Sequence, residues 1–415
     1  MEEEPANSVP RQGHVLLLPY PGQGHVNPMI QFGRRLVARG LRATLLTTVF
    51  ISNSMRFGSS IGSVHLATIS DGFDESGFQS APCIDDYLSQ LRATGSNTLA
   101  HLIRQYSTTQ HPVDCLVYEP FLPWALDVAK EHGLFAAAFF TQPCAVDYIY
   151  YNIQNKLLSL PIESTPVIIP GLPPMELGDM PSFVKFPEAY PAYFEMVLSQ
   201  FSNTDKADYV LINTFYHLDN RLKDDDDYGI DLFEREAAVS LDWVASKPPA
   251  SVVYVAFGSM ASFSQQQMEE LLEGLKSTNM YFLWVIRASE QANLPATFVI
   301  GDKGLVVSWS PQVEILSREA IGCFFSHCGW NSTIEALSLG VPIVGMPQWT
   351  DQPPNAKLVE DVWKVGIRVR VGDDGIVRRE EVEECVRRVM DHGELRNNAR
   401  KWKALAVEAV SQGGT

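Results

Sequence analysis

Short apolar runs separated by helical segments recur along the chain, and this alternation limits the fold more than any other feature. The runs of the first half lie at 14–20, 41–48, 64–70, 115–120, 134–140 and 209–214. They are apolar on both of the faces that a strand presents, and strands of that kind form parallel sheets covered by helices. The pattern therefore predicts an α/β fold built on a parallel sheet.

The same pattern restarts after a polar, proline-ended connection between Lys223 and Ser251. Its runs lie at 251–259, 281–287, 304–309, 321–327, 341–346 and 367–371. A helix after the first run begins with a capping box of Ser264 and Gln267. A single hydrophobic core rarely accommodates 415 residues. We therefore expect two Rossmann-like, doubly wound domains, 1–240 and 241–415. Domains of this kind face each other across a cleft at the carboxyl ends of their strands.

The charge balance and the cysteines limit the partners and the compartment. A formal net charge of −17 argues against nucleic acid or an anionic membrane as a partner. The six cysteines have no CxxC spacing and several lie inside apolar runs, which is typical of reduced core thiols. The acidic start does not resemble a signal peptide, and no apolar run approaches the roughly 20 residues of a membrane span. We therefore expect a cytoplasmic protein.

The loop after the first run, "PYPGQGHVNPM", does not match the two common nucleotide loops. Gly22 and Gly24 fit the first glycines of a dinucleotide fingerprint, but Asn27 occupies the third position. The next run ends without the acidic residue that binds the ribose of a nicotinamide cofactor. The lysine of a phosphate loop is also missing here. A nicotinamide oxidoreductase is therefore disfavoured.

His25 is the candidate catalytic side chain of this loop. It lies at the carboxyl end of a predicted strand, where α/β folds carry their chemistry, and the glycines beside it permit close approach of a ligand. A neutral imidazole is a natural general base for a hydroxyl group. The other reading is a histidine that caps the helix or fills the core. The residues alone leave both readings open.

The second half contains a denser group of polar residues in "FFSHCGWNSTIEAL", residues 324–337. A predicted strand ends at His327, and a tight turn leads into a helix that begins near Asn331 and Ser332. The free N–H groups of a helix N-terminus suit a diphosphate, to which these three side chains add hydrogen-bond donors. Glu335, one turn further on, suits the two hydroxyls of a ribose.

Two other strand ends of the same half add to this group. Trp309 offers a flat face for a base, and the stretch "PQWTDQ" places Asp351 and Gln352 where sugar hydroxyls would accept and donate hydrogen bonds. A capped helix with tryptophans in the core would explain any one of these features. Their combination at the strand ends of one domain favours a binding site.

The stretch from Trp309 to Gln352 resembles the signature box of the plant family 1 UDP-glycosyltransferases. The loop "PGQGHVNPM" and the "FGS" at 257–259 fit the same family, and the similarity covers nearly the whole chain. The resemblance implies a glycosyltransferase fold of the B type and an inverting reaction with UDP-glucose as co-substrate. It further implies no metal or other cofactor, a monomer, and a small hydrophobic acceptor such as a phenolic or a steroid.

The resemblance also implies roles for individual residues. His25 matches the general base, and Glu119 stands where the family has the aspartate that orients it. The residues that match the UDP-sugar site are Gly24 and Thr141 from the first domain, Trp309 and Ser310 at uracil, Gln312 and Glu335 at ribose, Ser259, His327, Asn331 and Ser332 at the diphosphate, and Trp330, Asp351 and Gln352 at the sugar. In this family, a glutamine at the last position of the box usually accompanies glucose as the transferred sugar, and Gln352 occupies that position here.

Three departures from the family stand out. Glu119 is one methylene longer than aspartate, so it either reaches His25 or points to solvent. The connection at 215–250 is shorter than in the family, and the last helix, which in the family packs back on the first domain, ends early. The run Asp224–Asp227 is read as a solvated acidic loop rather than a metal site.

We therefore expect an inverting UDP-glucose-dependent O-glucosyltransferase that acts on a steroid or a phenolic such as a flavonoid. The same enzyme acting on a carboxylate to make glucose esters is one alternative. A nucleotide-sugar-binding protein without catalysis is another, and the presence of His25 disfavours it.

Overall fold

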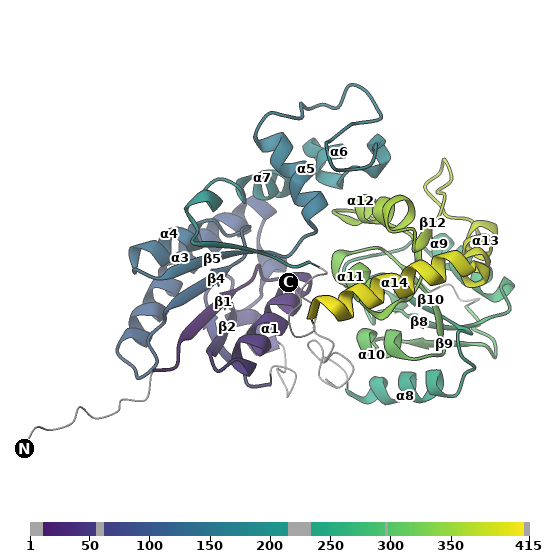
Figure 1. Ribbon diagram of the computed structural model, residues 1–415, viewed down its shortest axis with the longest axis horizontal. Helices are drawn as coiled ribbons and strands as arrows, with labels where there is room; N and C mark the ends of the chain where they lie inside the picture. Colours follow the sequence, from purple (N-terminus) through teal and green to yellow (C-terminus); the bar gives the residue numbers. More distant parts are fainter. Residues whose placement is uncertain (1–10, 55–61, 215–233, 295–297, 411–415) are drawn as a thin grey trace, which may run out of the picture. The chain divides into compact units, whose positions relative to one another are not determined.

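The computed structural model describes residues 11–54, 62–214, 234–294 and 298–410. They form two compact units that are interleaved along the chain (Figure 1). The first unit contains residues up to Thr141 together with Ser199–Leu211, and the second contains Gln142–Leu198 together with the chain from Ile212 onward. The domain limits 1–240 and 241–415 stay a prediction. The run Asp224–Asp227 and most of the short connection lie outside the described residues.

The first unit is built on a sheet that contains all six strands predicted for the first half. They are β1 (His14–Leu18), β2 (Arg42–Thr48), β3 (His65–Ile69), β4 (Cys115–Tyr118), β5 (Phe135–Phe140) and β6 (Tyr209–Ile212), in the order β3-β2-β1-β4-β5-β6. The pairs from β3 to β5 are parallel. The helices of this unit are α1 (Gln23–Ala38), α2 (Val49–Ser54), α3 (Ile84–Ser107) and α4 (Trp124–Glu131), with short turns η2 (Phe78–Ser80) and η5 (Thr204–Lys206).

The second unit also contains the six strands that its sequence predicts. They are β7 (Val252–Ala256), β8 (Tyr281–Val285), β9 (Gly304–Val307), β10 (Ile321–Ser326), β11 (Ile343–Gly345) and β12 (Gly366–Arg368), in the order β12-β11-β10-β7-β8-β9. Its helices are α5 (Cys144–Gln154), α6 (Ser182–Lys185), α7 (Pro191–Ser199), α8 (Glu234–Ala245), α9 (Gln265–Ser277), α10 (Gln312–Ser317), α11 (Trp330–Leu339), α12 (Gln352–Lys357), α13 (Arg379–Asp391) and α14 (Gly393–Val410). The short turns are η3 (Leu177–Asp179), η4 (Pro187–Ala189), η8 (Gln291–Asn293) and the π-helical η9 (Leu358–Val362).

Both sheets follow one strand order, because β7 to β12 repeat the arrangement of β1 to β6. In this order the chain reverses direction across the sheet between the first and fourth strands. Ligands of doubly wound folds bind outside the carboxyl ends of the strands at that switch point. The fold therefore directs attention to the residues that follow β1 and β4, and to those that follow β7 and β10.

Successive side chains of β7 point to opposite faces of the sheet, which explains why the predicted strands are apolar on both faces. Val252, Tyr254 and Ala256 belong to one buried cluster, which packs against α10, α11 and α14. Val253 and Val255 belong to a second cluster, which packs against α9 and α13 on the other face. Each face of the sheet is thus covered by helices, as the sequence predicts for parallel strands.

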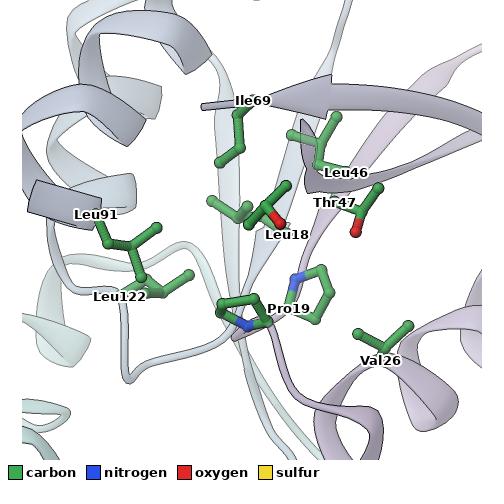
Figure 2. Close-up of a pocket in the computed structure, with 10 residues that line it drawn as sticks. Leu18, Pro19, Val26, Leu46, Thr47, Ile69, Leu91 and Leu122 are labelled. Carbon is green, nitrogen blue, oxygen red and sulfur yellow. The ribbon is translucent and has the colours of Figure 1, made fainter. Parts of the chain in front are cut away.

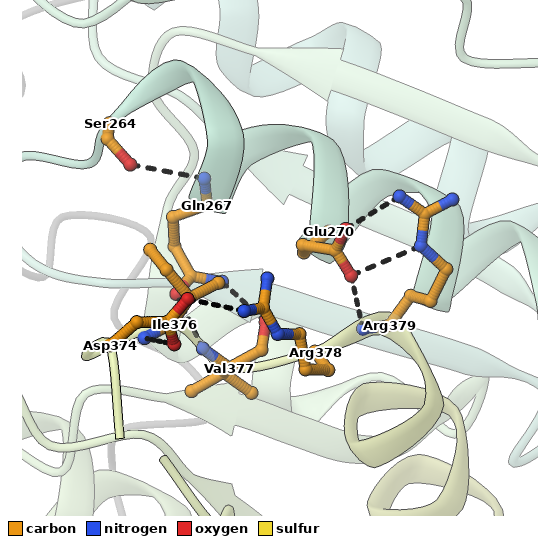
Figure 3. A network of polar contacts seen from close by, with 8 residues as sticks. All are labelled: Ser264, Gln267, Glu270, Asp374, Ile376, Val377, Arg378 and Arg379. Atoms are coloured by element: carbon orange, nitrogen blue, oxygen red, sulfur yellow. Dashed lines mark hydrogen bonds and ion pairs between the residues drawn. The ribbon is translucent and has the colours of Figure 1, made fainter. Parts of the chain in front are cut away.

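Only half of the capping box predicted for α9 is formed. The Ser264 hydroxyl accepts a hydrogen bond from the Gln267 N–H at 3.2 Å, as expected. The Gln267 amide is buried and does not reach back to the cap, because it pairs with the Val377 backbone, donating to the carbonyl at 3.0 Å and accepting from the N–H at 2.9 Å. Figure 3 shows this pairing beside the ion pair of Glu270 with Arg379, which joins α9 to α13.

No helix among the residues that the structure describes is both long enough and apolar enough to cross a membrane.

Candidate active site

His25 lies in the first turn of α1, immediately after β1. The sequence suggests that His25 lies on a loop, but α1 begins at Gln23, with Gly22 as its N-cap. The His25 N–H donates to the Gly22 carbonyl at 2.9 Å, and Pro28 is accommodated inside the helix. The histidine is therefore held on regular helix at the carboxyl edge of the sheet rather than on an irregular loop.

Glu119 directly follows β4, the neighbour of β1, in register with the end of that strand. Its N–H donates to the Leu18 carbonyl at 2.9 Å, and its Oε2 accepts the Tyr20 N–H at 2.9 Å. The residue is only 1% exposed. The alternative in which this carboxylate points to solvent is therefore wrong.

The side chains of His25, Glu119 and Thr141 meet at the switch point of the first unit. Nδ1 of the imidazole lies 2.5 Å from Glu119 Oε1 and 2.9 Å from the Thr141 hydroxyl oxygen. Thr141, which follows β5, donates its hydroxyl to the same Oε1 at 2.5 Å. A carboxylate can only accept at Nδ1, so the neutral ring carries its proton there and its lone pair on Nε2.

Two aromatic rings flank the imidazole. Tyr20 lies edge-on at a centroid distance of 5.3 Å, and Phe121 lies at 5.5 Å. No sequence pattern indicates a role for either ring, although each is within five residues of a predicted site residue. Together they limit the rotation of His25, whose side chain is 24% exposed.

In the second unit, His327 follows β10 at the corresponding switch point and lies between two glycines. A Cβ atom on Gly258 or on Gly329 would approach its Nε2 within 2.5 Å. Gly258 also has a φ of +76°, which other residues rarely adopt. The glycine of the "FGS" motif therefore makes room for the imidazole. Burial lowers the pKa of His327 to about 4, so the ring is neutral at physiological pH.

The helix that the sequence predicts after this strand is α11, which begins at Trp330 with Gly329 as its N-cap. Gln312, at the start of α10, donates from its amide to the Ser332 hydroxyl at 2.9 Å and to Glu335 at 2.7 Å. Ser310 lies 3.0 Å from the hydroxyl of the buried Tyr254. Sequence reasoning missed Tyr254 because it stands inside an apolar strand run.

Three further residues are predicted to hold the sugar of UDP-glucose. Asp351 and Gln352 stand together at the start of α12, where the side-chain amide oxygen (Oε1) of Gln352 accepts the backbone N–H groups of Gln348 and Trp349 at 2.8 and 3.1 Å. The side chain of Trp330 is committed within the fold, because its indole N–H donates to the Asn213 carbonyl at 2.8 Å. The indole N–H of Trp330 is therefore not available to a sugar.

The other positions predicted for the donor lie at strand or helix ends of their own units. Gly24 is in the first turn of α1, and Asn331 is in the first turn of α11. Trp309 follows β9 and is half-buried. Ser259 follows β7, and its carbonyl accepts a hydrogen bond from Arg287. Within the described ranges no group of three or more His, Cys, Asp or Glu side chains is arranged to hold a metal ion.

We expect the chain to lose stability below neutral pH, and His327 sets the window. Its pKa of about 4 lies below its ordinary 6.5, so between these values the unfolded chain binds a proton that the folded chain does not. The free energy of unfolding therefore falls as the pH drops from about 6.5 towards 4, by roughly 3 kcal/mol in total. Denaturant titrations at pH 7, 6 and 5 measure this slope.

His327→Asn is expected to reduce the slope of the free energy of unfolding against pH. A smaller slope should remain in the variant, because burial also lowers the pKa of His14. A variant with the slope of the wild-type protein would show that another group causes the acid sensitivity.

The two sheets, with their shared strand order and with histidines at both switch points, are those of a glycosyltransferase of the B type. The family model described as "UDP-glucoronosyl and UDP-glucosyl transferase" matches residues 183–406, and the chain belongs to this family of UDP-glycosyltransferases.

Two relatives and a solved structure support the same family. The chain is 48% identical to UDP-glycosyltransferase 74F2 of Arabidopsis thaliana, over 98% of this chain and 96% of the relative. It is 47% identical to the flavonol 7-O-beta-glucosyltransferase UGT74F1 of the same plant, over 97% and 96% of the two chains. The structure of Os79 from O. sativa in complex with UDP superposes with a TM-score of 0.88 at 40% identity, covering 96% of this chain and 97% of that one.

The first alignment runs over 441 positions, more than the 415 residues of the chain. That relative therefore has residues without a counterpart here, as a shortened connection would produce.

Proposed function

We propose that the protein is an inverting O-glucosyltransferase that transfers glucose from UDP-glucose to a hydroxyl of a small lipophilic acceptor, with His25 as general base. The observation that carries the proposal is the hydrogen bond of 2.5 Å between Nδ1 of His25 and the buried carboxylate of Glu119. This bond leaves the lone pair of the neutral imidazole on Nε2, the form that a base requires.

The proposed step balances without a metal or another cofactor. Nε2 takes the proton of the acceptor hydroxyl as its oxygen attacks the anomeric carbon from the face opposite UDP. The bond between that carbon and the β-phosphate oxygen breaks, and its electron pair stays on UDP. Glu119 then stabilises the imidazolium that has formed, while the N-terminus of α11 stabilises the charge that develops on the diphosphate.

The donor is proposed to bind to the second unit. The linked side chains of Gln312, Ser332 and Glu335 support this, because they gather an amide, a hydroxyl and a carboxylate beside a helix N-terminus. The full proposed set is Ser259, Trp309, Ser310, Gln312, His327, Trp330, Asn331, Ser332, Glu335, Asp351 and Gln352, with Gly24 and Thr141 from the first unit. Thr141 has a second proposed task, since its hydroxyl also holds Glu119.

The first unit contains a small cavity, about the size of one water molecule, whose apolar lining agrees with a lipophilic acceptor group (Figure 2). The pocket lies at the carboxyl ends of β1, β2 and β3, and Pro19 and Val26 from the loop and helix around His25 form one wall. Leu91 and Leu122 form another. A relative with 47% identity bears the name of a flavonol glucosyltransferase, which agrees with a flat phenolic acceptor.

Among the side chains that line this pocket, Thr47 has a buried polar atom without a protein partner. The residue is 5% exposed, and among the described residues its hydroxyl oxygen has no hydrogen-bond partner. Figure 2 shows this oxygen on the side of Pro19 and Val26. Because a buried hydroxyl without a partner is unfavourable, we propose that it bonds an oxygen of the acceptor.

Thr47→Val is expected to raise KM roughly five- to tenfold for acceptors with an oxygen remote from the attacked hydroxyl, the value of one lost hydrogen bond. Acceptors without that oxygen should keep their KM, and KM for UDP-glucose should not change. Thr48→Val is the matched control, because the Thr48 hydroxyl is already used by the Ile51 N–H at 3.2 Å. An equal rise for every acceptor would contradict the role of Thr47.

The test of the proposed function is product formation followed by mass spectrometry. The protein is incubated with UDP-glucose or UDP-galactose and a panel of phenols, sterols and carboxylic acids, with and without EDTA. A gain of one hexose on phenols or sterols, strongest with UDP-glucose and unaffected by EDTA, is expected. Transfer to carboxylates alone would replace the acceptor class, and binding of UDP without any transfer would overturn the catalytic proposal.

We further propose that the enzyme acts as a monomer in the cytosol. All six cysteines lie in the described residues, and all six are free thiols, which agrees with a reducing compartment.

A further inference from the structure

The loop 348–352, which carries Asp351 and Gln352, is held from outside by a segment far away in the sequence. Ser182, at the start of α6, donates its N–H to the Thr350 carbonyl at 3.0 Å. Thr350 has a φ of +57°, a left-handed conformation that a β-branched residue rarely adopts. Such a backbone persists only where neighbouring contacts impose it.

The aromatic rings of the same segment supply these contacts. Trp349 meets Phe183 edge-on at a centroid distance of 5.9 Å, and meets Tyr190 at 6.1 Å and Tyr193 at 6.2 Å. Phe183 and Tyr193 are stacked on each other at 5.4 Å with an angle of 12°. Phe183 is 4% exposed, so this cluster of four rings is anchored in the interior of the second unit.

The segment is also tied to the far end of α12, the helix that begins at Gln352. Asp179 is 2% exposed and accepts a hydrogen bond from Arg368 of β12. The ammonium group of Lys357, the last residue of α12, lies 3.5 Å from the same carboxylate. The polypeptide from Asp179 to Tyr193 thus contacts both the loop before α12 and the end of that helix. We name it the brace.

We propose that the brace is a positioning element for the sugar part of the donor, with Tyr193 and Phe183 as its main positioning residues. The inference rests on the proposed role of Asp351 and Gln352 at the sugar hydroxyls. The rings and the Ser182 N–H fix Thr350 in its left-handed conformation, and this backbone sets the direction of the two side chains that follow. Loss of the rings lets the loop relax and weakens its grip on glucose.

The brace has a selective effect because it contacts one part of the donor site. Gln312, Ser332 and Glu335 hold one another by hydrogen bonds between α10 and α11, and none of the contacts described for the brace reaches them. The affinity for UDP, which has no sugar, should therefore be insensitive to the brace. A general loss of stability would weaken both ligands alike.

The experiment compares Tyr193→Leu with Tyr193→Phe, which keeps the ring. KM for UDP-glucose, the inhibition constant of UDP and the melting temperature are measured for the full chain. We expect Tyr193→Leu to raise KM for UDP-glucose roughly five- to tenfold, the size of effect of lost ring contacts, with the inhibition constant of UDP within about twofold of wild type. Tyr193→Phe should retain the wild-type KM. Tyr190→Leu, at the edge of the cluster, should give a smaller rise and serves if Tyr193→Leu does not fold.

Gln352→Ala separates this inference from the proposed function. A higher KM for UDP-glucose in that variant supports the sugar role of the loop, and an unchanged KM overturns it together with the brace. If Gln352→Ala responds but Tyr193→Leu and Tyr190→Leu leave KM unchanged, or raise it in parallel with the inhibition constant of UDP, the positioning role of the brace is overturned alone.

Discussion

His25→Ala is expected to lower kcat by at least about 10²-fold, within the 10²- to 10⁴-fold that a positioned general base contributes. The variant keeps the helix, because alanine is the best helix former and the position lies in the first turn of α1. It removes the ring that accepts the proton and leaves Oε1 of Glu119 with the Thr141 hydroxyl as its donor. Steady-state kinetics with UDP-glucose and one accepted phenol measure the loss.

The inhibition constant of UDP should stay near its wild-type value in His25→Ala, because the residues proposed for the nucleotide belong to the other unit. His101→Ala is the matched control, since His101 is exposed on α3 and should show wild-type kinetics. A His25→Ala protein with undiminished kcat would remove the base assignment. A parallel loss of UDP affinity would show instead that the substitution disturbs the fold.

The twelve strands could be predicted because a buried parallel strand leaves a direct record in the sequence. A run such as "VVYVA" must be apolar on both faces, as Val252 to Ala256 are in the two clusters of the second unit. The helix N-termini at Ser264 and near Asn331 were also predictable from local residue types. These features depend on neighbours within a few positions.

Contacts between distant residues could not be predicted in the same way. The capping box failed because Val377, over a hundred residues away, takes the amide of Gln267. Trp330 is predicted to contact the sugar, and nothing near it in sequence indicates that its indole N–H donates to the Asn213 carbonyl. Thr141 was matched to a sugar role, although its hydroxyl also bonds the Glu119 carboxylate, since strand order decides which side chains meet.

The role of Glu119, which replaces the aspartate of the family, follows from the sequence motif and the strand register together. The resemblance marks the position, but only the strand register shows that a longer side chain fits. Glu119 leaves β4 beside the end of β1, and its Oε2 is fixed by the Tyr20 N–H at 2.9 Å. The extra methylene lets Oε1 reach both Nδ1 of His25 and the Thr141 hydroxyl at 2.5 Å.

Glu119→Gln is accordingly expected to lower kcat by roughly 10- to 10²-fold, less than His25→Ala, with little change in KM for UDP-glucose. The carboxylate accepts three hydrogen bonds on two oxygens, and an amide has only one oxygen. If the amide oxygen faces His25, its NH₂ group opposes the Tyr20 N–H. If the NH₂ group faces Nδ1, that nitrogen must accept, so the proton moves to Nε2 and the ring can no longer act as the base.

Glu119→Asp keeps the charge and separates reach from electrostatics. A shorter carboxylate cannot satisfy the Tyr20 N–H and the His25–Thr141 pair together in this register, so its kcat should fall between wild type and Glu119→Gln. If Glu119→Gln retains the wild-type kcat, the carboxylate does not serve the histidine, and His25 acts alone. If Glu119→Asp is as slow as Glu119→Gln, the length of the side chain matters as much as its charge, which the three hydrogen bonds of Glu119 would then explain.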